Sequence, residues 1–226
     1  MITDKETNFF RINFCNVPKE YPYPKRFLTS STKNKCKGDT MGFLSFGPKK
    51  DKIKKLIEEE RFDDIITMVM KDKKALDGLI ELLDDSVPGI RGDALLILGM
   101  IAEQRGEVLE SRIDRIFPKA VELTKNRNPY VKENAMVLSY ELARRFQTKI
   151  MKLKDTIISD LIEEIREGDK NTKGFALILL GELDAKETRE YVEELVNVED
   201  KVILPFEGKK WVPLGQIARE TLEKLS

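Results

Sequence analysis

From residue 51 onward, apolar residues recur at the three- and four-residue spacing of α-helices, in stretches separated by short polar turns. Four alanines, Ala94, Ala135, Ala176 and Ala218, mark equivalent stretches and recur at intervals of 41, 41 and 42 residues. A period in the low forties with two helices per unit is typical of an α-solenoid, which is a stack of antiparallel helix pairs. We therefore predict an all-α fold of this kind.

Aliphatic side chains surround each of these alanines, as in residues 90–98. A larger side chain there would push the two helices of a unit apart, so we expect Ala135 and Ala176 to be tight helix–helix contacts. The turns before three second helices place a polar residue six positions before a basic one: Asp85 before Arg91, Asn126 before Lys132, and Glu167 before Lys173. We interpret this spacing as a ladder of polar contacts within and between units. The alternative is that the three basic residues form a ligand-binding row.

Two short helices predicted at 52–60 and 63–70 do not follow the repeat and are typical of a terminal cap. Four helix pairs are predicted after them: 76–83 with 88–103, 113–123 with a helix from 129, 157–165 with 175–183, and 191–196 with 214–225. In the last unit, β-prone runs around Glu207-Gly208 predict a small β-hairpin within residues 201–212. We expect Trp211, Val202 and Leu204 to cover the open apolar end of this unit.

Residues 1–40 contain a Tyr-Pro-Tyr-Pro run but no helical periodicity, which predicts a disordered extension. Met41 opens a plausible protein start, so the alternative is that this extension lies upstream of the true start at Met41. Residues 41–72 are then a linker and the capping helix pair. Residues 73–226 form the repeat domain.

Composition excludes several classes of site. The 226 residues include no His, which excludes Ser-His-Asp and Cys-His catalysis and His-ligated zinc. Carboxylate pairs such as Asp84-Asp85 fall in turns or on exposed helical faces and have no perturbing neighbours. We therefore expect no enzymatic activity, no catalytic residues, no cofactor and no metal.

Both cysteines, Cys15 and Cys36, precede the repeats, so nothing in the repeats calls for disulfides. No apolar run reaches the roughly 18 residues of a membrane span, and residues 1–30 lack the apolar segment of a signal peptide. We expect a cytoplasmic protein with no membrane contact. Charged residues make up 35% of the chain, with abundant Lys and Glu, a composition that favours a thermophile.

The motifs Asp85-x-x-x-x-Ile90-Arg91-x-x-Ala94 and Ile217-Ala-Arg-Glu-Thr-Leu222 resemble those of the HEAT-repeat family, particularly its short, cyanobacterial-lyase-like branch common in archaea. The resemblance covers residues 73–226 well and 51–72 loosely. It departs from the family at Gly215, which replaces a basic residue, and at the hairpin insertion. The resemblance implies a right-handed α-solenoid whose second helices line a concave face used for protein contact. HEAT motifs are degenerate, so this likeness is specific for fold and weak for activity.

A net charge of zero hides a basic middle between acidic flanks. Residues 111–154 carry 11 Lys/Arg against four Asp/Glu, whereas residues 155–226 carry 10 against 17. Seven cations in and beside this middle fall at junctions between units and form the candidate partner-binding set: Arg144, Arg145, Lys149, Lys152, Lys154, Arg105 and Arg112. The alternative is that they compensate helix C-termini or are ordinary solvated side chains.

We predict a non-enzymatic HEAT-repeat scaffold that mediates protein–protein interaction, with an acidic partner at this basic central rim. The alternative is a nucleic-acid-binding HEAT-like protein, similar to the HEAT-like alkylpurine DNA glycosylases. Overall neutrality and a single Trp count against it, because such proteins need a continuous basic groove and aromatic residues. A third hypothesis, a lyase or chaperone for a bound cofactor, comes from family analogy alone.

Overall fold

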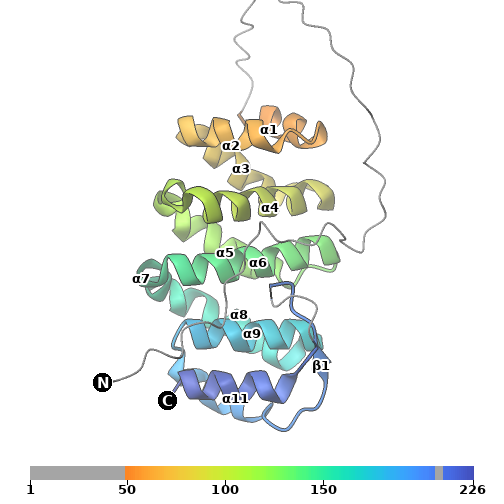
Figure 1. The fold of residues 1–226 in the computed structure, drawn as a ribbon, viewed down its shortest axis with the longest axis vertical. Coiled ribbons are helices and arrows are strands. Elements are labelled where there is room, and N and C mark those ends of the chain that lie inside the picture. The colour runs from red at the N-terminus through yellow and green to blue at the C-terminus, as the bar shows by residue number, and fades with distance from the viewer. Residues whose placement is uncertain (1–48, 207–210) are drawn as a thin grey trace, which may run out of the picture. The chain divides into compact units, whose positions relative to one another are not determined.

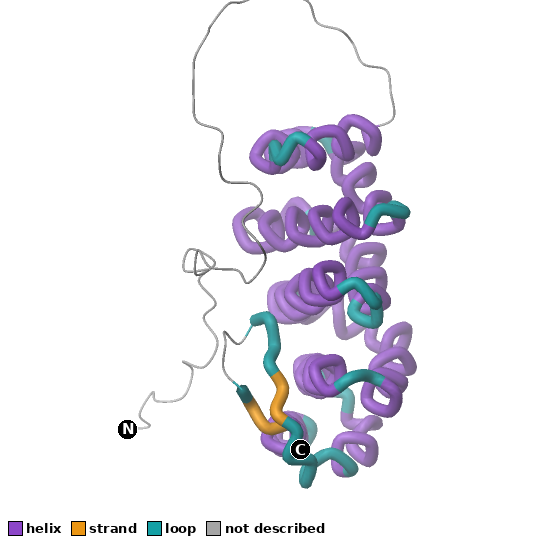
Figure 2. The backbone as a smooth tube through the Cα atoms, turned by 90° about the vertical axis from the view of Figure 1, so that its right-hand side faces the viewer, coloured by secondary structure: helices purple, strands orange, loops and turns teal. Residues whose placement is uncertain are grey.

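Antiparallel helix pairs stack one on the next in the computed structural model, which describes residues 49–206 and 211–226 (Figure 1). The first helices of the pairs form one layer and the second helices form another, and the two layers are seen edge-on in Figure 2. The fold is an all-α solenoid with a small β-hairpin, as the repeat spacing predicts. The predictions for residues 1–40, for a start at Met41 and for a turn at Glu207-Gly208 concern residues outside the described ranges.

The helices begin and end close to the predicted boundaries. The cap is α1 (Lys49–Glu58) and α2 (Phe62–Lys71), and the paired helices are α3 (Lys73–Glu81) with α4 (Pro88–Arg105), α5 (Ile113–Leu123) with α6 (Pro129–Arg145), α8 (Lys154–Glu167) with α9 (Lys170–Glu182), and α10 (Arg189–Glu193) with α11 (Leu214–Lys224). Shorter elements join them: η2 (Leu82–Asp84), η3 (Gly106–Val108), η4 (Glu110–Arg112), α7 (Gln147–Ile150), η5 (Met151–Leu153), η6 (Lys186–Thr188), β1 (Lys201–Val202) and β2 (Val212–Pro213).

Second helices start where the sequence supplies N-terminal signals. The Asn128 side chain caps α6 by accepting hydrogen bonds from the backbone N–H groups of Tyr130, at 3.0 Å, and Val131, at 3.3 Å. Asp169 caps α9 by accepting from the Thr172 N–H at 2.9 Å. Such caps satisfy N–H groups that have no partner within the helix. They therefore fix where each second helix begins.

The repeated alanines lie in the centre of the core. Ala94, Ala135, Ala176 and Ala218 are all fully buried, within four different second helices. The second helices do not pack equally well against one another. The α4–α6 and α9–α11 contacts are extensive, whereas the α6–α9 contact is much smaller. The insertion of the last unit lies at this weaker contact.

The insertion leaves α10, forms the β1–β2 hairpin and lies over the second-helix layer (Figure 2). Its inward side chains alternate, and Val202, Leu204 and Phe206 are 0%, 0% and 5% exposed. Val202 and Leu204 are therefore buried, but the prediction that they cover the open end of the last unit is wrong, because the insertion packs on α9 and α6 instead. The same prediction for Trp211 is wrong, because this side chain is 60% exposed. Phe206 fills the aromatic position against the helices instead, while the Lys170 Nζ lies 5.7 Å from the centroid of the Trp211 ring.

Candidate functional site

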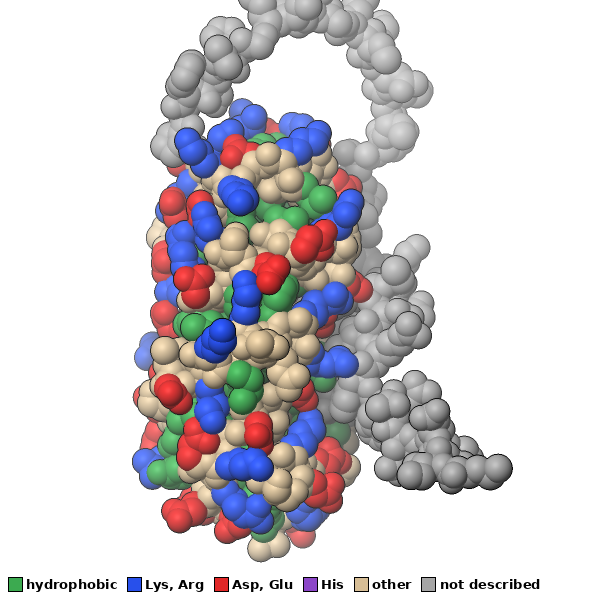
Figure 3. All heavy atoms as spheres, turned by 90° about the vertical axis from the view of Figure 1, so that its left-hand side faces the viewer, with side chains coloured by type: hydrophobic (Ala, Val, Ile, Leu, Met, Phe, Trp, Pro, Cys, Tyr) green, Lys and Arg blue, Asp and Glu red, His purple; other side chains and the backbone are tan. Residues whose placement is uncertain are grey.

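The seven candidate cations lie along the junction edge, which we define as the edge of the solenoid formed by the ends of α4 and α6 together with η3, η4, α7 and η5. Figure 3 views the molecule from this side, and Lys/Arg and Asp/Glu side chains alternate over it. No continuous basic strip is visible on this face. The structure therefore places the candidates on one edge but intersperses them with carboxylates.

Most of these cations have an acidic partner within the chain. Arg112 donates two hydrogen bonds to Asp77, from Nε at 2.7 Å and from an Nη at 3.1 Å. The other ion pairs are Lys149 with Glu110 at 3.2 Å, Lys154 with Glu187 at 3.0 Å, Arg105 with Glu107 at 3.6 Å, and Arg145 with Glu141. The Arg144 guanidinium lies 5.5 Å from the centroid of the Tyr140 ring, and Lys152 is exposed. Several of these pairs join different units, so they connect the basic middle to its acidic flanks.

The predicted ladder is present in part. Asp85 accepts a hydrogen bond from Lys54 of the preceding cap at 2.8 Å, and Lys132 donates to Asp169 of the next unit at 2.5 Å. Arg91 instead donates to the backbone carbonyl of Asp85, at 2.6 Å. Lys173 likewise donates to a backbone carbonyl, that of Arg166. Arg91, Lys132 and Lys173 are therefore engaged in contacts within the protein. This supports the interpretation that they join helices over the alternative that they form a ligand-binding row.

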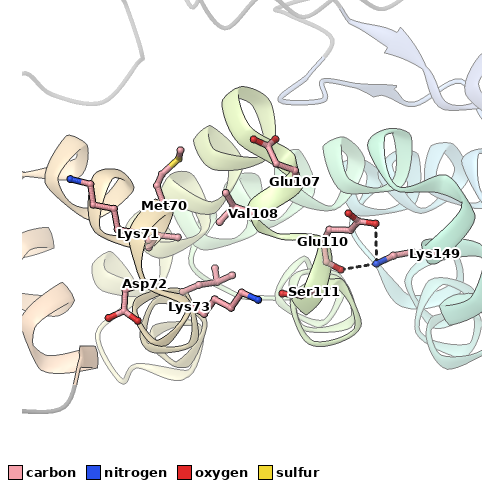
Figure 4. A pocket seen from close by; sticks show the side chains of 11 residues that line it. Met70, Lys71, Asp72, Lys73, Glu107, Val108, Glu110, Ser111 and Lys149 are labelled. Atoms are coloured by element: carbon pink, nitrogen blue, oxygen red, sulfur yellow. Dashed lines mark hydrogen bonds and ion pairs between the residues drawn. The ribbon is translucent and has the colours of Figure 1, made fainter.

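A pocket of about 520 Å³ opens on the junction edge between the cap and the first two units (Figure 4). Its walls carry both charge signs, and Glu110 holds Lys149 there by two contacts. The lining residue Asp72 caps α3, and a hydrogen bond from Lys49 lowers the pKa of its carboxyl. These groups have structural partners, so the pocket presents no activated acid, base or nucleophile.

A second surface is the second-helix face, which we define as the side of α4, α6, α9 and α11 that points away from the first helices. Leu96, Val137 and Ile178 occupy the same position in successive units, at intervals of 41 residues, and are partly exposed. They form an apolar row across α4, α6 and α9. The 3.6-residue period brings further residues of each helix, three or four positions away, onto the same face.

The insertion is bound to this face as an extended segment. The Phe206 ring stacks on Tyr140 of α6 with centroids 4.3 Å apart and meets Phe175 of α9 edge-on at 6.4 Å. The backbone N–H of Ile203 donates to the Asn171 side chain at 3.1 Å. A Cβ on Gly174 would lie only 3.2 Å from a Val202 methyl, so the absence of a side chain lets the strand approach α9 closely. One face thus supplies an aromatic clamp and a side-chain acceptor for a backbone N–H.

The same face carries carboxylates over α4 and α6. The Tyr130 ring packs so closely on Gly92 that a Cβ there would lie 2.2 Å from a ring carbon, and its hydroxyl donates to Asp93 at 2.5 Å. Burial raises the pKa of Asp93, although this hydrogen bond opposes the rise. Burial also raises the pKa of Glu133, which has no hydrogen bond or ion pair among the described residues.

The family resemblance implies a contact face lined by the second helices, but the sequence does not indicate which residues of that face form the site. Tyr140, Phe175 and Asn171 have no shared sequence signal, because single-helix patterns show which residues are apolar but not which meet the insertion. The available signal was the 41-residue register, which aligns the exposed positions of successive second helices. Among the described residues no cluster of acidic or metal-binding side chains could hold a metal ion, and no helix is long and apolar enough to cross a membrane.

Comparisons with known proteins support the architecture. No model of a known protein family matches the sequence, and no curated protein matches it. Among solved structures, a computationally designed armadillo repeat protein for modular peptide recognition is similar, with a TM-score of 0.50 and 18% identity over 68% of each chain. At this identity the likeness shows the fold alone, which is a helical repeat solenoid. The resemblance to HEAT repeats in particular has no match among the family models.

Proposed function

We propose that this protein is a non-enzymatic scaffold that binds a protein partner by laying an extended segment of that partner across its second-helix face. The observation that carries the proposal is the insertion, which is itself an extended segment seated on this face through Phe206 and the Ile203 N–H. A surface that binds one extended segment of its own chain has the groups needed to bind another. The similar designed armadillo repeat protein, which was made for modular peptide recognition, is also a helical repeat solenoid.

The junction edge is the weaker candidate for partner binding. An acidic partner there would have to compete with Glu110, Glu141 and Glu187, which already pair with the cations. Exposed ion pairs contribute little individually, so such competition yields little free energy. The same pairing argues against nucleic acid as the partner, because phosphate binding needs cations that remain available along a continuous path.

A peptide-display selection on the immobilised full-length protein tests the proposal. The probe is a library of unconstrained twelve-residue peptides, and each enriched peptide is measured again on two variants. Val137→Arg places a bulky charge in the apolar row of the second-helix face, whereas Ile162→Arg makes the same change at a partly exposed position of α8 in the first-helix layer. Thermal unfolding of both variants shows whether the fold is retained.

We expect enriched peptides to lose about tenfold or more in affinity on Val137→Arg and to keep it on Ile162→Arg, because a buried charge opposite an apolar anchor is strongly unfavourable. Peptides that depend on neither substitution, or that bind the junction edge, would overturn the proposal. A selection that enriches no peptide would also count against it.

A further inference from the structure

The 41-residue repeat shows which residues of the preceding units correspond to those that contact the insertion. Asn171 and Phe175, which contact the insertion on α9, correspond at intervals of 41 residues to Tyr130 and Asn134 on α6. Phe175 corresponds further to Asp93 on α4. A segment that continues along the path of the insertion toward the N-terminal units therefore passes over Asp93 and Tyr130.

The chemistry of this path changes from one unit to the next. On α9 the insertion meets an aromatic ring, a glycine and an amide, and its own apolar side chains fit them. At the equivalent positions α6 has Tyr130, Glu133 and Asn134, and α4 has Gly89, Gly92 and Asp93. A neutral apolar segment like the insertion would bury these carboxylates without compensation, which is unfavourable.

Neither carboxylate forms an ion pair with a described residue. Asp93 accepts a hydrogen bond from the neutral phenol of Tyr130 at 2.5 Å, and the neighbouring charge that acts on its carboxyl is that of Glu60. Lys132, the neighbour of Glu133 in sequence, is engaged with Asp169 at 2.5 Å. The partly exposed residues Leu96 and Val137 continue the apolar row beside them. The charge of Lys132 only partly offsets the effect of burial on the pKa of Glu133. This part of the face therefore combines an apolar row with two carboxylates that have no ion pair among the described residues.

We infer that the partner segment is basic: it runs over α4 and α6 in extended form, continuous with the seat of the insertion, and places a Lys or Arg side chain against Asp93 and Glu133 while an apolar side chain packs on Leu96 and Val137. This inference rests on the proposed use of the second-helix face. It assigns the partner a charge opposite to that expected from the basic middle of the sequence. Charge complementarity across a partly desolvated surface selects partners more strongly than exposed pairs do.

The test compares two synthetic peptide pools of equal length that share alternating apolar positions. One pool has Lys fixed at a central position between two apolar positions. The other pool has Glu at the same position. Binding of each fluorescein-labelled pool is measured by anisotropy on the full-length protein, on the double variant Asp93→Asn, Glu133→Gln, and on Val137→Arg. The matched control is Asp114→Asn, Glu190→Gln, which removes two exposed carboxylates from the first helices α5 and α10.

We expect the Lys pool to bind at least tenfold more tightly than the Glu pool, and to weaken about five- to tenfold on the face variant but not on the control. Added salt should reduce this preference. Equal binding of both pools, or an unchanged preference on the face variant, would overturn the inference. If binding of both pools depends on Val137 but shows no charge preference, the basic partner fails while the peptide-binding face stands. If neither pool needs Val137, both fail.

Discussion

The junction edge and the second-helix face carry charges in opposite ways. At the junction edge Arg112 forms an ion pair with Asp77 at 2.7 Å, and Lys149 with Glu110 at 3.2 Å, so most of the charges there are paired within the chain. On the second-helix face Glu133 has no such partner among the described residues, and burial raises its pKa. Charges that are already paired hold units together. Charges that are left without a partner are the ones available to an incoming molecule.

The largest effect on stability is expected from Glu164. Its carboxyl is only 2% exposed and lies between α5 and α8. Burial raises its pKa to about 7. Thr124 Oγ1 lies 2.6 Å from both the Val121 carbonyl oxygen and Glu164 Oε1. The Thr124 hydroxyl has one proton to donate to these two oxygens, and its hydrogen bond to Glu164 opposes the rise in pKa without overcoming the effect of burial. The opposite carboxyl oxygen, Oε2, is buried without a partner.

We predict that the free energy of unfolding falls by about 2–3 kcal/mol as the pH rises from about 4.5 to about 7, on account of Glu164. The folded-state pKa is raised, so the stabilisation is complete below the unfolded-state pKa and is lost as the pH rises through the folded-state value. Glu164→Gln keeps the volume and removes the titration. Urea unfolding at several pH values should therefore give a flatter profile for this variant, whereas Glu190→Gln should keep the slope of the parent.

A moderate effect on the free energy of unfolding should distinguish the paired charge of Lys125 from the charge of Glu133, which has no ion pair among the described residues. Lys125 donates to Asp160 at 2.9 Å and to Glu163 at 2.8 Å, joining units two and three. Burial lowers the pKa of Lys125, but these hydrogen bonds more than offset it and the pKa is raised. Lys125→Gln should lower the free energy of unfolding by about 1 kcal/mol. Glu133→Gln should leave it unchanged or raise it slightly, and equal losses in denaturant melts would contradict the comparison.

A smaller effect is expected at the exposed junction-edge pairs. Reversing Arg145 and Lys149 to Glu breaks the ion pairs with Glu141 and Glu110. Because these pairs are partly or fully exposed, the double variant should lose about 1 kcal/mol at most. It should also keep its affinity for peptides selected on the second-helix face. If the double variant lost that affinity while its fold stayed intact, the result would place the binding site at the junction edge instead.

The smallest change in stability is expected at Trp211, whose side chain is 60% exposed. Trp211→Ala should leave the melting temperature nearly unchanged, since little apolar surface is buried there. As the only Trp in the chain, Trp211 also reports its own environment. Its emission in the native protein should be red-shifted and readily quenched by iodide. Blue-shifted, protected emission would mean that the ring packs on the helices after all.

The sequence predicts the architecture well because the repeat encodes it locally. The spacing of Ala94, Ala135 and Ala176 predicts the helix pairs, and Pro88 and Pro129 mark the starts of two second helices in the structure. These signals act within one helix or between neighbouring helices. Predicting that Val202 and Leu204 are buried also needs only the alternation of a strand.

The site was harder to predict because it depends on which distant residues meet. The charge blocks of the sequence show a basic middle, but Arg112, Lys149 and Lys154 pair with carboxylates 33 to 39 residues away, as for Arg112 and Asp77. Trp211 was expected inward because aromatic residues in hairpins usually pack on the core. The stacking of Phe206 on Tyr140, 66 positions apart in the chain, has no local sequence signal.

If a partner segment lies along the second-helix face as proposed, the insertion limits how many of its residues the face can contact. Packed helices lie about 8–10 Å apart, and an extended chain advances about 3.3 Å per residue, so each unit spans about three residues of a bound segment. With Phe206 seated on Tyr140, a segment running toward the insertion has the α4 and α6 units to cross, which corresponds to roughly six residues. On this proposal, lengthening or shortening the insertion between α10 and α11, with every helix kept, would change how many helical units a bound segment can cross.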